Sequence, residues 1–252
     1  MDNEITISAQ FNGPATSGNG GYVSGILAEG FDDALAVKVD LKSPPLLDHA
    51  FAFHKSDDGN RATLMEGEQV ICKAEVTTLD MADMPKMPNL DQVTAAHNNP
   101  IKNVFPVLDK CFVCGTDRDE PTIQGGGLHV HAGPIDGREG EIACFWDLSD
   151  QWSDDDGNIL PRYIWSALDC PGYYACAPGM PVLLGSMTTQ IYKKLPAGGR
   201  AIIHGWSKNV GDASARKRLC GTALYTVDGT LIAASEAVWV IVPQSLYDKL
   251  SG

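Results

Sequence analysis

Apolar residues recur at helical spacing near the start of the chain and gather in short extended runs beyond residue 35. From Tyr22 to Phe31 the apolar positions lie three and four residues apart, which predicts a helix that ends at Gly30. Strands are predicted around this helix at 5–11, 35–41, 49–55, 61–66 and 69–79. Turn residues separate the later runs, so these strands are expected to be antiparallel.

The same layout recurs after a segment without periodicity. Residues 81–125 contain scattered prolines and end at the triple glycine 125–127, which predicts a long connection with one short helix. A second helix is predicted from Leu160, with Pro161 in its first turn. Extended segments flank it at 128–132, 140–148, 182–192, 200–208, 216–226 and 230–242. We therefore predict an internal repeat, with one domain over 1–80, a connecting segment over 81–125 and a second domain over 126–252.

Composition and charge narrow the class of protein. The chain of 252 residues is 44% hydrophobic and 20% charged, as folded proteins are. Its formal charge of -13 would repel a phosphate backbone, so nucleic acid is not an expected partner. No apolar run approaches the roughly 18 residues of a membrane span, and no membrane partner is expected. The start Met1-Asp2-Asn3-Glu4 lacks an export signal and the seven cysteines are an odd number, which together predict a cytoplasmic protein with reduced thiols.

Five segments carry a resemblance to a known family. The segment 18–28, Gly18-Asn19-Gly20-Gly21-Tyr22-Val23-Ser24-Gly25-Ile26-Leu27-Ala28, resembles the Gly-Gly helix start of acyl-CoA thioesterase II proteins. The segment 164–169, Ile164-Trp165-Ser166-Ala167-Leu168-Asp169, is similar to the second central helix of that family. The C-terminal segments 190–195, 212–216 and 225–235 are similar to its last strands. The resemblance implies an α+β double hotdog, in which two central helices are each wrapped by an antiparallel β-sheet.

Asp169 is the general base that this resemblance implies, in a reaction that hydrolyses an acyl-CoA thioester to the free acid and CoA. It stands in an otherwise apolar helix, where a carboxylate must be paired, hydrated or functional. Cys170-Pro171-Gly172 follows it directly, so a role as a helix cap or turn residue is the alternative.

In the family, a Thr and a Gln help the Asp to orient the attacking water. The Thr position falls among Ser186, Thr188 and Thr189, and Thr188 is our candidate. The Gln position lies near Glu236 and Ala237, and Glu236 is the polar candidate there.

The start of the first helix is the candidate substrate-binding segment. Free N–H groups at a helix start can hold a developing oxyanion, and Gly20 and Gly21 would let a substrate approach the backbone. Asn19 either contacts the substrate or caps the helix. Tyr22 stands where the family has Gln, so it is the fourth candidate for substrate contact.

A cluster of cations provides candidates for binding the CoA phosphates. Seven of the 19 basic residues lie between 193 and 218, and Lys193, Lys194 and Arg216 are the ones we select. The alternative is that these are solvent-facing strand charges, which prevent edge pairing.

The sequence also contains residues that could bind a metal ion. Cys111 and Cys114 form a Cys-x2-Cys pair, and His129 and His131 would project to the same side of a strand. The usual His pair in zinc sites is separated by three to five residues, so the prediction is no metal and two packed thiols. No cofactor is expected, because CoA enters as part of the substrate.

Two other functions compete with thioester hydrolysis. The first is a hotdog protein that binds an acyl-CoA or aromatic-CoA ester without turning it over, which the missing family residues favour. The second is a hydratase, which needs a His/Asp pair at a helix start that neither helix supplies. Two hotdogs in one chain can pair internally, and a homodimer is a further possible assembly.

Overall fold

The computed structural model describes residues 3–32, 35–102, 105, 108–118, 126–211 and 214–250. The first half begins with strand β1 (Asn3–Thr6), the 3₁₀ turn η1 (Ala9–Phe11) and helix α1 (Gly20–Ala28). The strands that follow are β2 (Ala36–Leu41), β3 (Ala50–Lys55), β4 (Arg61–Glu66) and β5 (Gln69–Thr77). The strand predicted at 5–11 ends at Thr6, because the chain turns into η1 with Phe11 N–H bonded to Ser8 O at 2.9 Å.

The connecting segment contains helix α2 (Leu90–His97), so its predicted short helix is present. The second half begins with β6 (Gly133–Pro134), β7 (Glu141–Asp147), η3 (Asp150–Trp152) and α3 (Pro161–Cys176). The last elements are β8 (Val182–Ile191), β9 (Arg200–Ser207), β10 (Lys217–Thr226), β11 (Leu231–Ile241) and α4 (Gln244–Lys249). Residues 128–132 form no strand, because the amides of Leu128 and Val130 bond instead to the carbonyls of Phe112 and Val113.

One antiparallel sheet of eleven strands forms the body of the described structure, in the order β1-β3-β4-β5-β2-β8-β11-β10-β9-β7-β6. From its outer edge inward, the first half follows the order β1-β3-β4-β5-β2. The second half follows the matching order β7-β9-β10-β11-β8, with β6 added at the edge. Strands β2 and β8 pair in the centre and join the halves into a continuous sheet.

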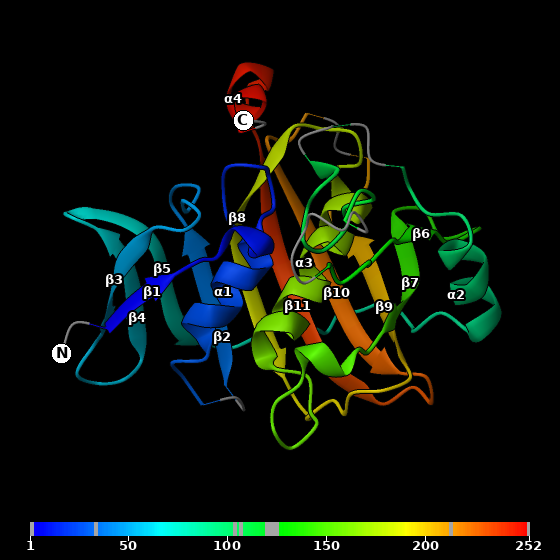
Figure 1. Cartoon of the computed structure of the whole chain (residues 1–252). Coiled ribbons are helices and arrows are strands. Elements are labelled where there is room, and N and C mark those ends of the chain that lie inside the picture. Colours follow the sequence, from blue (N-terminus) through cyan, green and yellow to red (C-terminus); the bar gives the residue numbers. More distant parts are fainter. Residues whose placement is uncertain are drawn as a thin grey trace.

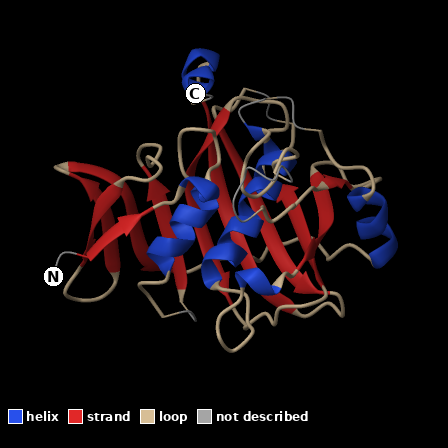
Figure 2. Ribbon diagram, viewed as in Figure 1, coloured by secondary structure: helices blue, strands red, loops and turns tan. Residues whose placement is uncertain are grey.

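Helices α1 and α3 lie side by side on one face of this sheet (Figures 1 and 2). Glycines allow their close contact. A Cβ atom on Gly21 would lie 2.6 Å from Asp169 Cβ, and one on Gly25 would lie 2.6 Å from Arg162 Cα. Both distances are shorter than a carbon contact permits, so the helices can approach this closely only because α1 has glycine at these positions.

The opposite face of the second half is covered by α2 and the segment before it. Along β7, Ile142 and Cys144 belong to the core shared with α3, whereas Ala143 packs with Val93 and Ala96 of α2. Side chains alternate along a strand, so α2 lies on the face away from α3. No helix among the described residues is both long and apolar enough to span a membrane.

Candidate active site

A cavity of about 220 Å³ opens where the start of α1 meets the second half of α3 and the adjacent ends of β8 and β11. Its wall is mainly apolar, with side chains that include Leu41, Leu108, Tyr173, Leu184, Trp239 and Tyr247. Asn19, Gly20 and Asp169 supply polar groups at one place in this wall. An apolar cavity with a few converging polar groups is the usual form of a small-molecule site.

Asp169 is buried on α3 and is held by the start of α1. Its Oδ2 atom accepts hydrogen bonds from Asn19 Nδ2 at 2.9 Å and from the Gly21 N–H at 3.0 Å. Its Oδ1 atom is also buried and has no hydrogen-bond partner among the described residues. One oxygen of the carboxylate is therefore fixed in place, and the other has its acceptor capacity unused.

Burial raises the pKa of Asp169 from 3.8 to about 7. The Gly21 N–H lowers this pKa, negative charge on Cys111 raises it, and the Asn19 amide lowers it again. A carboxylate is a more effective proton acceptor at neutral pH when its pKa lies near that pH. Desolvation in this wall thus gives Asp169 the basicity that its side chain lacks in water.

Some N–H groups at the start of α1 are bonded to side chains, and one has no partner among the described residues. Asn19 is the helix cap, because its Oδ1 accepts from the Tyr22 N–H at 2.9 Å, and its Nδ2 also holds Asp169. The Gly21 N–H is occupied by Asp169 as well. The Gly20 N–H, in the cavity wall, has no acceptor among the described residues. One amide at the positive end of the helix thus remains for a ligand.

Tyr22 lies in the core, and the residues that line the cavity do not include it. Its ring stacks on Phe11 with centroids 3.9 Å apart. Burial raises the pKa of Tyr22 to about 12, although a hydrogen bond with Arg162 lowers it. Tyr22 is therefore a packing residue behind the helix start, rather than part of the cavity wall.

Thr188 and Glu236 lie opposite each other on β8 and β11. The neighbouring Thr189 faces the helices and shares a small hollow with Trp165, so Thr188 and Glu236 face the other side of the sheet. Glu236 forms an ion pair there with Lys208. The structure does not bring either predicted residue to Asp169. The Thr189 hydroxyl bonds to Ser235 Oγ at 3.0 Å.

The three selected cations lie at different ends of the sheet. Lys193 and Lys194 follow the end of β8, roughly 30 Å along the strand from the cavity residue Leu184. Arg216 is exposed, and its carbonyl accepts from the Ile241 N–H at 2.9 Å, at the end of β11 that borders the cavity. Lys42 is a cation in the cavity wall that the sequence interpretation missed.

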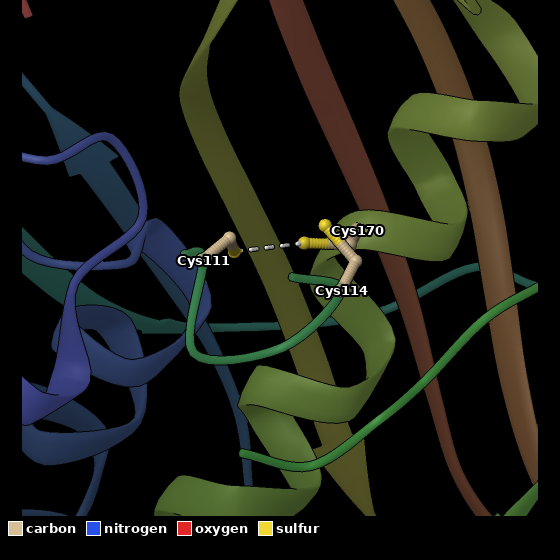
Figure 3. Close-up of side chains that lie close together, drawn as sticks. All are labelled: Cys111, Cys114 and Cys170. Carbon is tan, nitrogen blue, oxygen red and sulfur yellow. Dashed lines mark hydrogen bonds between the residues drawn. The ribbon is translucent and has the colours of Figure 1, made fainter. Parts of the chain in front are cut away.

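Three cysteine sulfurs gather in one place (Figure 3), and two of these cysteines, Cys111 and Cys170, line the same cavity as Asp169. The Sγ atoms of Cys111, Cys114 and Cys170 lie within 4.8 Å of one another, and those of Cys111 and Cys170 are 3.8 Å apart. Hydrogen bonds from the Cys114 and Cys170 thiols hold the pKa of Cys111 well below its usual value. Cys170 was missed from the sequence, although it directly follows Asp169.

His129 and His131 do not belong to this cluster of sulfurs. The Nε2 atom of His131 lies 3.3 Å from the carbonyl oxygen of Gly115, and the two imidazole rings lie 6.1 Å apart. The two cysteines and two histidines that the sequence raised as possible zinc ligands therefore do not form one cluster among the described residues.

Neither a protein-family model nor a curated protein matches the chain. Solved structures do match it. An acyl-CoA thioesterase II, TesB2, from Mycobacterium marinum superimposes with a TM-score of 0.58 at 13% identity, over 96% of this chain and 93% of that one. A protein from Novosphingobium aromaticivorans, provisionally named a thioesterase, gives a TM-score of 0.62 at 10% identity over 95% of both chains.

A hotdog-fold protein of unknown function from Alicyclobacillus acidocaldarius gives a TM-score of 0.55 at 12% identity, over 95% of this chain and 92% of that one. At such low identities the matches concern the fold. They confirm the predicted hotdog fold and its similarity to thioesterase II structures over nearly the whole chain.

Proposed function

We propose that this protein is a double-hotdog acyl-CoA thioesterase that hydrolyses a thioester to a free acid and CoA. The observation that carries the proposal is the buried Oδ1 of Asp169, which has no hydrogen-bond partner among the described residues and belongs to the wall of an apolar cavity that Gly20 also lines. The repeated strand order supports a duplicated domain, and the names of the matching structures support the reaction class.

In this mechanism the thioester carbonyl points at the start of α1. The Gly20 N–H, aided by the helix dipole, stabilises negative charge on the carbonyl oxygen as it develops. Gly21 plays a different part from the one predicted, because its N–H holds the carboxylate. One backbone donor of this kind typically contributes about 10²- to 10³-fold in rate.

Asp169 is the general base. Its Oδ1 accepts a proton from a water molecule while the water oxygen attacks the carbonyl carbon, and the oxyanion of the tetrahedral intermediate bonds to Gly20. Collapse of the intermediate breaks the carbon–sulfur bond, and the proton on Asp169 passes to the departing sulfur. Asn19 and Gly21 act as positioning residues, because they fix Oδ2 and thereby aim Oδ1.

The cavity sets where each part of the substrate lies. The acyl group occupies the apolar part near Tyr173 and Trp239, where burial of its methylene groups favours binding. The CoA phosphates lie toward Lys42 and Arg216, which border the same end of the sheet. Lys193 and Lys194 have no part in this arrangement, since they lie at the opposite end of β8.

The decisive experiment is a thiol-release assay with a panel of acyl-CoA esters. The wild-type protein should turn over at least one ester, and Asp169→Asn should lower kcat by about 10²- to 10⁴-fold, the range typical of a general base. Asp147→Asn, which changes an exposed carboxylate at the end of β7, is the matched control and should retain the rate. An unchanged rate in Asp169→Asn would exclude this mechanism.

A non-catalytic CoA-ester binding protein is the second candidate. It is favoured by the placement of Thr188 and Glu236 on the face away from the helices, which leaves Asp169 without the predicted partners for orienting water. The same panel distinguishes the two functions. A binding protein would show a rise in Tm with a CoA ester and no release of thiol.

A further inference from the structure

The cysteine cluster combines two parts of the chain that are distant in sequence. Cys111 and Cys114 come from the connecting segment, and Cys170 comes from the middle of α3 (Figure 3). All three are buried, and among the described residues they are the one group of three or more His, Cys, Asp or Glu side chains whose ligand atoms lie close enough to share a metal ion. The cavity wall includes Cys111 and Cys170, whereas Cys114 does not line it.

The spacing of the sulfurs fits a thiophilic metal. Zinc bonds to thiolate sulfur are about 2.3 Å long, and two such ligands of a tetrahedral ion therefore lie about 3.8 Å apart. The Cys111 and Cys170 sulfurs are 3.8 Å apart, and all three sulfurs lie within 4.8 Å of one another. Only a small movement of Cys114 is needed for the three to share one ion.

The turn that carries two of the cysteines is held from several sides. The Gly115 N–H bonds to Cys111 O at 2.9 Å, and a Cβ atom on Gly115 would lie 2.6 Å from that oxygen. The Phe112 N–H bonds to Asn12 O at 2.8 Å, which fastens the turn to the first half. The backbone N–H groups of Val113 and Cys114 also lower the pKa of the Cys111 thiol. Such outer contacts orient metal ligands before the metal binds.

The charges also favour a cation at this position. Three buried thiolates alone would carry a large uncompensated charge, and a divalent ion reduces the total to about −1. Arg118 is buried nearby and interacts electrostatically with Cys111. Its guanidinium is fixed by Asn12 Oδ1 at 2.8 Å and Lys110 O at 2.9 Å. This fixed positive charge offsets the remaining negative charge.

We propose that Cys111, Cys114 and Cys170 bind one Zn²⁺ through three thiolates, with the fourth coordination position directed at the cavity. Each thiol of the cluster that still carries its proton releases it when the ion binds. A closed structural site has four protein ligands, whereas three protein ligands leave a position for water or a small ligand. The cavity supplies the route by which the ion enters. This assignment stands apart from the proposed hydrolysis and holds for an enzyme or a binding protein.

The test uses the full-length protein, purified without oxygen, stripped with a chelator and titrated with Co²⁺. We expect one Co²⁺ per chain, with the thiolate-to-cobalt charge-transfer and visible d–d absorption of a tetrahedral sulfur site. Added Zn²⁺ should displace the cobalt and abolish both signals. X-ray absorption of the zinc form should give three sulfur neighbours at about 2.3 Å.

Variants locate the site. Cys114→Ala should weaken metal binding by more than the 10- to 100-fold that loss of a supporting residue typically costs. Cys144→Ala is the matched control, because Cys144 is an equally buried thiol on β7 outside the cluster, and it should keep full binding. If Cys114→Ala does not fold, the absorption spectrum of the wild-type zinc form still decides the ligand set.

The proposal would be overturned by the absence of stoichiometric metal in the reconstituted wild type, by equal binding in Cys114→Ala, or by oxygen or nitrogen neighbours in place of sulfur. A native protein whose mass shows a disulfide within the cluster would also contradict it.

Discussion

The two halves of the sheet share a strand order but differ on the face that lies away from helices α1 and α3. In the first half this face is polar, and Lys38, Asp40, Lys73 and Glu75 lie on it along the paired strands β2 and β5. In the second half the same face carries Ile202, Trp206, Ala223 and Tyr225. These side chains pack with α2 and with the methionines at 81, 84 and 87 of the connecting segment.

This comparison shows what a second covering layer does to a strand. β5 alternates between buried and more exposed positions, as a strand with one wet face does. β9 is buried from Ala201 to Trp206 without interruption, because α3 covers one face and the connecting segment the other. The same topology thus tolerates two sequence patterns, depending on what lies above each face.

The largest effect is expected from Trp206→Ala. Trp206 is buried on the covered face, and truncation of a buried aromatic side chain typically costs about 3 to 5 kcal/mol. Lys73→Ala, on the polar face of the first half, should change the free energy of unfolding by no more than about 0.5 kcal/mol. Urea unfolding measures both values. Similar decreases in the free energy of unfolding in the two variants would show that the covered face contributes no more to stability than the polar face does.

Gly21→Ala probes the junction between the halves. The added methyl would lie 2.6 Å from Asp169 Cβ and 2.8 Å from Trp165 O, and overpacking of this kind typically costs about 1 to 3 kcal/mol. Gly25→Ala meets the Arg162 backbone at 2.6 Å, away from the carboxylate, and serves as the control. Both variants should be less stable to urea, but only Gly21→Ala should displace Asp169 and lower kcat. Equal turnover in the two would argue against that link.

Asn19→Ala and Asn89→Ala remove comparable helix caps with different surroundings. Asn19 caps α1 and also bonds to Asp169, whereas Asn89 caps α2 through a capping box with Gln92. Each loss should cost about 1 kcal/mol of stability in thermal unfolding. Only Asn19→Ala should also reduce thiol release, since Asn89 has no contact with the cavity wall. A matching decrease in both variants would mean that helix stability alone governs the rate.

The smallest expected effect is a change in how stability depends on pH. Burial lowers the pKa of His204 on β9, while Glu141 at 2.7 Å raises it and Arg138 lowers it. Because the unfolded chain holds this proton to a higher pH, stability rises with pH between the folded and unfolded values. The contribution is complete above about pH 6.5 and is lost as the pH falls through the folded pKa.

His204→Gln should therefore flatten the acid side of a plot of unfolding free energy against pH. His54→Gln, on the exposed face of the equivalent strand β3, should leave that slope unchanged. A slope that is identical in wild type and His204→Gln would assign the acid sensitivity to other groups.

Local sequence signals predicted most of the helices and strands. Apolar spacing located α1 and α3, and turn residues located most strands, because these signals depend on neighbouring residues only. The predictions at 5–11 and 128–132 were wrong in extent because other segments decide those hydrogen bonds, as with the bonds from Leu128 and Val130 to the cysteine turn. No local pattern reveals a partner that is distant in the sequence.

The site was only partly predictable for the same reason. Asp169 and the Asn19-Gly20-Gly21 segment do meet, as the resemblance implied, and Asn19 fulfils its alternative role as a cap. A shift of one residue changes the face of a strand, which is why Thr189 rather than Thr188 faces the helices. Lys193 and Lys194 were selected with Arg216 because the three are close in sequence. They lie far apart in the structure, because the two ends of a long strand are distant from each other.

The bond between Gly21 and Asp169 joins residues 148 positions apart in the chain. A contact of such long range forms only after both halves have folded and docked, since its two partners belong to different halves. The proposed hydrolysis would therefore require both halves to have folded and docked. Neither half in isolation can hold the carboxylate in working position, however well its own strands pair.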